Sequence, residues 1–236
     1  MEITPELKEK LSLLHEKYAA LGEDFNAYLE GLLYADVTTY WDYIQLDTLL
    51  SLQKPKTSFP DEVVFIMYHQ ITELYFKLAL REFEALGKIQ APTKAHFVDR
   101  VGRINRYFDA LVKSFEIMID GMDRDEFLKF RMSLLPASGF QSAQYREIEI
   151  FSTDFINLVA KDKRDELRAE NTIEKLFEHI YWKAGATEVA TGKKTLTLIQ
   201  FEEKYKDQFV ALGEKCKNKN LWQVYLRLST EDQADE

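Results

Sequence analysis

The sequence predicts an all-α protein, a helical bundle organised around two long antiparallel helices. Nine glycines and five prolines make up 14 of 236 residues, about half of average usage, so the residues that turns and strand bulges require are scarce. Apolar residues also recur at helical spacing in almost every segment. These two observations argue against a sandwich, a barrel or a doubly wound sheet.

The N-terminal segment predicts short helices. Thr4 is a typical helix cap, and Pro5 suits the first helical position. One apolar stripe then follows at helical spacing: Leu7, Leu11, Leu14 and Tyr18. A second short helix is expected at about 24–35. Residues 40–53 form a connector that leads into a short helix, for which Asp47 is the candidate cap.

Two long helices are expected in the middle of the chain. The first spans about 61–86, and its apolar residues keep the 4-3-4 spacing of a buried seam: Met67, Ile71, Leu74 and Leu78. The second has a heptad-like pattern: Phe97, Val101, Ile104, Phe108, Leu111, Phe115 and Met118. Two such helices should pack antiparallel.

Shorter helices are expected in the rest of the chain, at 123–134, 141–158, 173–182 and 198–216. The first of them ends before Pro136, as a helix must when proline follows. Thr195 or Thr197 starts the last one. The stretch 184–194 is expected to be a loop.

Composition indicates one soluble domain over 1–236, with N-terminal helices in 1–39, a core in 40–181 and a loop with C-terminal helices in 182–236. No apolar run approaches the roughly 20 residues of a membrane span, and the N-terminus does not resemble a secretory leader. A cytoplasmic location is therefore expected, and the single cysteine, Cys216, fits a reducing compartment. A net charge of −9 argues against a nucleic-acid partner.

Standard cofactor motifs are missing from the sequence. It contains no GxGxxG and no GxxxxGK[ST] motif for nucleotides. A zinc-protease HExxH motif begins at His15 and fails at Ala19. The four histidines are scattered, at positions 15, 69, 96 and 179, so we expect neither a zinc nor a di-iron site.

The segment FIMYHQITELYFKL places a histidine inside an otherwise apolar helix. Phe65, His69 and Glu73 lie one turn apart and share a face. His69 could be a core residue bonded to Glu73 or to a backbone carbonyl. Because the neighbouring residues do not form a simple apolar stripe, the face also resembles the wall of a pocket.

A second segment, FLKFRMSLLPASGFQSAQYR, offers a candidate anion-binding residue. Phe127 and Arg131 lie four residues apart, just before a break. Arg131 could bind a carboxylate through two parallel hydrogen bonds, or it could be an ordinary surface arginine beside the acidic residues of its helix. Tyr40 and Tyr43 could present hydroxyls on an aromatic surface, or they could simply pack.

Together these segments resemble the tryptophan 2,3-dioxygenase family, haem enzymes that open the indole ring of L-tryptophan to give N-formyl-L-kynurenine. The resemblance runs from about Tyr40 to Tyr181. Its most specific pieces are YWDYIQLDTLLSLQ, FIMYHQITELYFKL and FRMSLLPASGFQSAQYR, which occur in the family's order. It implies an all-helical homotetramer that uses tryptophan and dioxygen, in which the N-terminal part of one subunit reaches the active site of its neighbour.

The resemblance also implies roles for particular residues. His69 matches the catalytic histidine that meets the indole N–H, and Phe65 matches the aromatic wall of the substrate pocket. Arg131 matches the arginine that binds the substrate carboxylate. Tyr40 and Tyr43 match two tyrosines that come from the adjacent subunit.

Two features depart from the family's pattern. Phe127 stands where the family commonly has a tyrosine, which removes a hydroxyl from the substrate-binding site. Haem b is expected from the resemblance, but the family's iron-ligating histidine has no counterpart here, because no histidine follows His179. We therefore expect this chain to bind haem weakly or not at all, as a shortened version of a longer protein would.

Three functions compete on this basis. The leading one is a tryptophan 2,3-dioxygenase. The second is a related haem enzyme that oxygenates another aromatic amino acid, which Phe127 favours. The third is a non-catalytic, haem-free binding protein or scaffold of the same fold, which the missing iron ligand favours.

Overall fold

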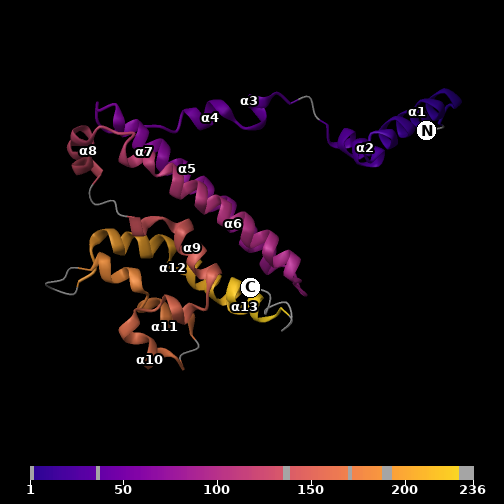
Figure 1. Cartoon of the computed structure of the whole chain (residues 1–236). Helices are drawn as coiled ribbons and strands as arrows, with labels where there is room; N and C mark the ends of the chain where they lie inside the picture. Colours follow the sequence, from indigo (N-terminus) through magenta and orange to yellow (C-terminus); the bar gives the residue numbers. More distant parts are fainter. Residues whose placement is uncertain (1–2, 36–37, 135–138, 170–171, 188–192, 229–236) are drawn as a thin grey trace. The chain divides into compact units, whose positions relative to one another are not determined.

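The computed structural model describes residues 3–35, 38–134, 139–169, 172–187 and 193–228. Every secondary-structure element of more than one residue in these ranges is a helix (Figure 1). The β interactions found there are two isolated bridges, Val159 with Ile180 and Thr187 with Lys194. The predicted all-α fold class is therefore confirmed. Within the same ranges, each helix is too short or too polar to cross a membrane.

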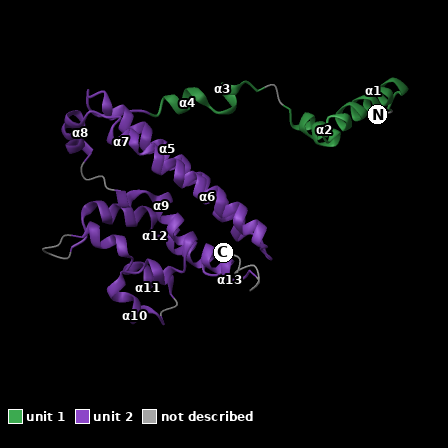
Figure 2. Ribbon diagram, viewed as in Figure 1, with its two compact units in different colours: residues 1–52 green, residues 53–236 purple. Residues whose placement is uncertain are grey.

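The chain groups into two compact units, residues 1–52 and 53–236 (Figure 2). The grouping alone does not test whether both units fold together, so the single domain expected over 1–236 stays a prediction. The first unit contains four helices: α1 (Pro5–Ala20), α2 (Phe25–Tyr34), α3 (Tyr40–Tyr43) and α4 (Leu46–Leu50).

The caps of the first unit follow local chemistry only in part. The Thr4 hydroxyl accepts from the Leu7 backbone N–H at 3.3 Å, as the sequence predicts. The prediction that Asp47 caps this helix is wrong, because α4 begins at Leu46, directly after Gln45. Gln45 has φ 53°, a left-handed conformation that a non-glycine residue seldom adopts. Asp47 lies instead in the first helical turn, where its negative charge interacts favourably with the helix dipole.

The second unit is built on two long helices, α5 (Asp61–Gly87) and α6 (Lys94–Ser114), with a short α7 (Glu116–Ile119) after them. On α5, the Tyr68 hydroxyl donates to the Leu111 carbonyl of α6 at 3.3 Å. Farther along α5, Glu82 accepts from Arg100 of α6 at 2.6 Å. The earlier residue of α5 contacts the later residue of α6, and the later residue of α5 contacts the earlier one, so the two helices run antiparallel.

The seam predicted on α5 is wrong. Met67, Ile71, Leu74 and Leu78 are each between 39% and 51% exposed. The buried face of α5 holds Tyr68, Ala79, Leu80, Phe83 and Leu86. This helix is apolar on more than one face, and α6 and α9 pack against the face that includes Phe83.

The remaining elements are short apart from one long helix. They are α8 (Arg124–Phe130), η1 (Arg131–Leu134), η2 (Gly139–Gln141), α9 (Ala143–Ser152), η3 (Phe155–Leu158), η4 (Lys161–Lys163), α10 (Arg164–Leu167), α11 (Ile173–Glu178), η5 (Tyr181–Ala186), α12 (Leu196–Cys216) and α13 (Leu221–Leu226). Thr195 caps α12 through the Leu198 N–H at 3.3 Å, which decides between the two predicted start residues.

Two helices end earlier than the sequence predicts, and one expected loop begins within a 3₁₀ helix. The helix expected over 141–158 breaks at Thr153, whose φ of −152° and ψ of 170° are extended. The helix expected over 173–182 ends at Glu178. Within the loop expected over 184–194, η5 continues to Ala186, and residues 188–192 lie outside the described ranges.

The main core lies where α5 and α12 pack on α9 (Figure 1). Large aromatic side chains fill its C-terminal part: Phe151, Phe177, Trp182, Phe201 and Phe209. Rings at this spacing, with centroids 5.6 to 6.3 Å apart among Trp182, Phe177, Phe201 and Phe209, stabilise a core through both burial and ring geometry.

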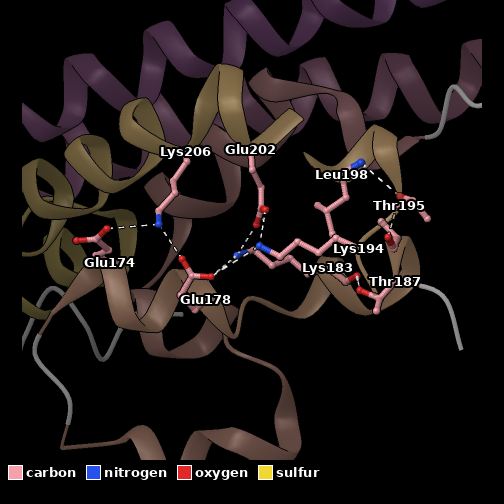
Figure 3. A network of polar contacts seen from close by, with 10 residues as sticks. Glu174, Glu178, Lys183, Thr187, Lys194, Thr195, Leu198, Glu202 and Lys206 are labelled. Atoms are coloured by element: carbon pink, nitrogen blue, oxygen red, sulfur yellow. Dashed lines mark hydrogen bonds and ion pairs between the residues drawn. The ribbon is translucent and has the colours of Figure 1, made fainter. Parts of the chain in front are cut away.

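A network of opposite charges lies beside this core (Figure 3). Lys183 is buried, and its ammonium lies 2.7 Å from Glu202 of α12. Lys194 also contacts Glu202, at 2.6 Å. Burial lowers the pKa of Lys183. Burial alone would raise the pKa of Glu202, but hydrogen bonds from the two lysines hold it below its ordinary value.

Candidate functional site

An open apolar groove of about 610 Å³ lies along α5 and α6. Its walls include Phe65, Tyr68, His69, Phe76, Phe108 and Tyr145. Residues from α7 and α9 complete it. A concave, mostly apolar surface with a few polar groups is the usual form of a small-molecule site.

His69 contributes an imidazole to the lining of this groove, and the residue is exposed. Its Nδ1 lies 2.8 Å from the Phe65 carbonyl oxygen, one helical turn earlier. A carbonyl oxygen only accepts hydrogen bonds, so Nδ1 is the protonated nitrogen of this contact, and in the neutral imidazole Nε2 is then the acceptor. Of the two core alternatives, the bond to Glu73 is wrong and the bond to a backbone carbonyl is present. His69 is not a core residue, however, because it is exposed.

Glu73 contacts a different partner. The Gln144 amide of α9 donates to the Glu73 carboxylate at 2.7 Å and to the Glu73 carbonyl at 2.9 Å. This pair ties α9 to α5 next to Tyr145, so it fixes one wall of the groove relative to the other.

Three phenylalanines connect α5 to α8 at the His69 end of the groove. The Phe65 ring lies 4.1 Å from the His69 ring and 6.1 Å from the Phe127 ring. Phe130 is fully buried and contacts both rings, at 5.8 Å and 5.5 Å. Phe65 and Phe127 are thereby held in place by a buried ring behind them.

Arg131 follows this aromatic cluster. It lies at the C-terminal end of α8, where its N–H bonds to the Phe127 carbonyl. Its guanidinium carbon lies 5.9 Å above the Phe127 ring, and the residue is exposed. Among the described residues, no carboxylate lies within ion-pair distance of Arg131. An exposed arginine at a helix end fits both predicted alternatives, an ordinary surface residue and a carboxylate-binding one, so the choice between them stays open. The guanidinium is available to an anion.

The structure brings together four of the six predicted site residues: Phe65, His69, Phe127 and Arg131. Tyr40 and Tyr43 lie on α3, in the other compact unit, where both are highly exposed, at 71% and 81%. The Thr39 hydroxyl caps that helix through the Asp42 N–H. Two exposed tyrosines beside an exposed Trp41 form an aromatic surface with free hydroxyl groups.

The other histidines and the cysteine lie outside the groove. His96 belongs to the cap of α6, and His15 contacts Phe25 in the first unit. Burial raises the pKa of the Cys216 thiol to about 11, so this thiol is protonated at neutral pH and is a poor ligand. Over the described ranges, the structure contains no cluster of three or more His, Cys, Asp or Glu side chains.

Sequence reasoning missed part of the groove lining. Tyr68, Thr72 and Val112 are not on any predicted stripe, and Phe108 and Phe115 were assigned to a helix seam. No sequence signal separated these residues from a buried seam, because a heptad pattern predicts packing and does not show which of its positions stay exposed.

Comparisons of the sequence with known proteins point to one family. A sequence profile described as tryptophan 2,3-dioxygenase matches residues 32–176, more than half of the chain. Proteins named tryptophan 2,3-dioxygenase from Ruegeria sp. (strain TM1040) and Bacillus cereus (strain ATCC 10987 / NRS 248) are each 39% identical, over 117 and 112 residues. One from Sorangium cellulosum (strain So ce56) is 42% identical over 123 residues.

These matches cover 49%, 47% and 47% of this chain and 42%, 40% and 29% of the respective relatives. The chain therefore spans about two fifths or less of the length of these relatives. The chain is a member of the tryptophan 2,3-dioxygenase family.

Proposed function

We propose that this chain acts in the oxidative opening of the indole ring of L-tryptophan, and that its groove binds the substrate. The observation that carries the proposal is that Phe65 and His69 line one apolar groove. Arg131 is linked to it through Phe127, whose ring lies 6.1 Å from the Phe65 ring and below the Arg131 guanidinium. An aromatic amino acid has the matching chemistry, namely a flat ring, an N–H donor and a carboxylate.

Each residue has a definite task in this proposal. The Nε2 lone pair of His69 accepts the indole N–H, because its Nδ1 proton is held by the Phe65 carbonyl. The Phe65 ring packs on the indole, which excludes water from the reacting face. Arg131 binds the carboxylate with two parallel hydrogen bonds and so fixes the orientation of the ring.

Haem is the cofactor expected for this reaction, and the described residues fit it only in part. The groove supplies apolar walls, but haem iron also needs an axial ligand. The proposal uses His69 for the substrate, and the Tyr68 hydroxyl already donates to Leu111. Met118 offers a thioether and Tyr145 a phenol, and neither is the imidazole that the family resemblance implies as the iron ligand. The described side chains do not form a complete haem site, so no step is assigned to haem.

The same donor set leads to a prediction about haem binding. Titration of the purified chain with hemin should give a weak, non-stoichiometric change in the Soret band, since no imidazole opposes His69. A sharp stoichiometric shift of the histidine-ligated kind would contradict this prediction. In that event His179→Ala should be measured next, because His96, the other histidine of the family-like region 40–181 besides His69, bonds to Thr93 in the cap of α6.

We further propose that the chain works as a homo-oligomer of the tetrameric kind, in which Tyr40 and Tyr43 contribute to a neighbour's groove. The exposure of both tyrosines supports this proposal. A second candidate function is binding without catalysis, which the incomplete haem site favours. Oxidation of another aromatic amino acid is a third, since Phe127 offers no hydroxyl to the substrate.

The role of Arg131 is tested by comparing two ligands with and without a carboxylate. Arg131→Leu should weaken L-tryptophan binding by about 2 to 4 kcal/mol and leave indole almost unchanged. Calorimetry on both ligands gives the two values. Arg124→Leu, which removes an exposed arginine from the start of the same helix, is the matched control. Equal weakening of both ligands by Arg131→Leu would sink the proposal.

A further inference from the structure

The first turns of α5 and α8 are joined by hydrogen bonds that lie outside the groove lining. The Asp61 carboxylate, in the first turn of α5, accepts the Asp123 backbone N–H at 2.5 Å. Asp123 is the cap of α8, where its own carboxylate accepts from the Glu126 N–H at 2.9 Å. The Glu126 carboxylate in turn accepts from the Asp61 N–H at 3.5 Å. Asp61 therefore ties the start of α8 to the start of α5.

A second contact between the two helices has the same register. Phe65 lies four residues after Asp61. Phe127 lies four residues after Asp123, and its ring is 6.1 Å from the Phe65 ring. Residues four apart share one face of a helix. Both contacts join residues whose numbers differ by 62, so α8 runs beside this part of α5 in the same direction.

The next pair in this register is His69 with Arg131. His69 lies eight residues after Asp61, and Arg131 lies eight residues after Asp123. Eight residues span about 12 Å of helix. The proposed function places the tryptophan ring at His69 and its carboxylate at Arg131. The register of α8 on α5 therefore sets the separation of the two side chains that hold one ligand.

The aromatic cluster alone does not fix this register. The Phe65 ring contacts Phe130 at 5.8 Å as well as Phe127. Because apolar contact is non-directional, a shift of α8 along α5 could exchange one ring for the other. The Lys129 ammonium lies 5.7 Å from the centre of the Phe59 ring, and its long side chain can follow such a shift. A hydrogen bond has a preferred distance and angle, so the bond to Asp61 selects one position.

The acceptor oxygen of Asp61 makes this contact, and its charge does not help. The contact brings the carboxylates of Asp61, Asp123 and Glu126 to neighbouring positions, and like charges repel each other. Asparagine has a side-chain oxygen in the same place that accepts an N–H without the charge. Asp61→Asn and Asp61→Ala therefore separate the role of the acceptor from that of the charge.

We propose that Asp61 is a positioning residue of the substrate site. Its carboxylate sets the register of α8 on α5 and thereby places the Arg131 guanidinium to bind the carboxylate of an amino acid whose ring lies in the groove. Asp61 acts through Arg131 and does not contact the ligand. The inference rests on the proposed function of the groove.

Discrimination between two ligands tests the proposal, by calorimetry on the full chain with L-tryptophan and with indole. Asp61→Ala should weaken L-tryptophan about tenfold and leave indole within about twofold, because only the carboxylate contact is misplaced. Asp61→Asn should bind both ligands within about twofold of wild type, because it keeps the acceptor. Asp125→Ala removes an exposed carboxylate from the first turn of α8 and is the matched control. It should bind both ligands as wild type does.

Amide hydrogen exchange gives a second readout that needs no ligand. In Asp61→Ala, the N–H groups of α8 should exchange at least about fivefold faster than in wild type, whereas those of α6 should be unchanged. In Asp61→Asn and Asp125→Ala, exchange in α8 should match wild type. This readout identifies a helix that has come loose from α5 while the rest of the unit stays folded.

Three results would overturn the proposal. The first is unchanged exchange in α8 of Asp61→Ala. The second is equal weakening of L-tryptophan by Asp61→Ala and Asp61→Asn, which would assign the effect to charge. The third is an Asp61→Ala variant that binds L-tryptophan normally while Arg131→Leu does not, which would leave the proposed function intact. A wild type that binds indole as tightly as L-tryptophan would overturn the proposed function, and this inference with it.

Discussion

Two aromatic regions of the same unit differ in whether they are closed. The cluster around Phe177 and Phe209 is sealed, with both rings at most 1% exposed. The groove on α5 and α6 has similar residue types, but His69 is exposed and Phe115 is 52% exposed. Rings that contact only other rings stabilise the fold, and rings left facing a groove are available to a ligand. The comparison predicts that the sealed rings stabilise the fold and that the rings of the groove contribute little to stability.

The charged residues of the two regions differ in the same way. Lys183 and Glu202 are paired with each other beside the sealed cluster (Figure 3). Arg131 stacks on Phe127 beside the groove and has no ion-pair partner among the described residues. A paired charge contributes to stability, whereas an unpaired and exposed one costs little to maintain and can recognise an anion.

The largest expected effect on the free energy of unfolding is at the sealed cluster around Phe177 and Phe209. Phe177→Ala removes a fully buried ring and should lower the free energy of unfolding by about 3 to 5 kcal/mol, through lost burial and the cavity left behind. Urea denaturation followed by far-UV circular dichroism measures it. Phe115→Ala, on the groove side, is the matched control and should cost about 1 kcal/mol or less. Similar losses of unfolding free energy in both variants would contradict the distinction between the sealed cluster and the groove.

A smaller effect is expected at the charge network. Glu202→Gln should cost about 2 kcal/mol at pH 7, because the buried Lys183 loses its nearest carboxylate and keeps only Glu178, at 3.5 Å. The pKa of Glu202 is held below its ordinary value by Lys183 and Lys194, so its contribution is complete above the unfolded-state pKa. It is lost as the pH falls through the lower folded-state pKa.

The stability gap between wild type and Glu202→Gln should therefore be full above about pH 5 and narrow below the ordinary glutamate pKa of about 4.3. Urea denaturation at several pH values measures the gap. Glu203→Gln, on the exposed side of the same helix, is the control and should show no such gap. A gap that stays constant down to pH 3 would show that the charge of Glu202 does not stabilise the fold.

Sequence alone predicts those features of the fold that local chemistry determines. Thr4 and Thr195 cap their helices as expected, because a cap needs only its own hydroxyl and an N–H three residues later. Both long helices are also present. The break at Thr153 was not predicted, since apolar residues continue through Phe155 at helical spacing and hide it.

The buried face of α5 could not be predicted, because it depends on which neighbours pack against the helix. A 4-3-4 stripe containing Met67 and Leu74 shows that one face is apolar, but α5 has a second apolar face containing Leu80 and Phe83. Periodicity does not say which of the two meets α6 and α9. The candidate site depended on the family resemblance, because the spacing around His69 and Arg131 alone left an ordinary structural role open for both.

The most direct test of the central claim measures stability and binding on one variant. If His69 faces the groove and serves the ligand, His69→Ala should change the free energy of unfolding by about 0.5 kcal/mol or less, while L-tryptophan affinity, measured by calorimetry, falls about tenfold. His179→Ala, which removes a histidine outside the groove, should leave the affinity unchanged. A loss of about 1 to 3 kcal/mol in stability with unchanged tryptophan binding would contradict the account, because it would make His69 a structural residue.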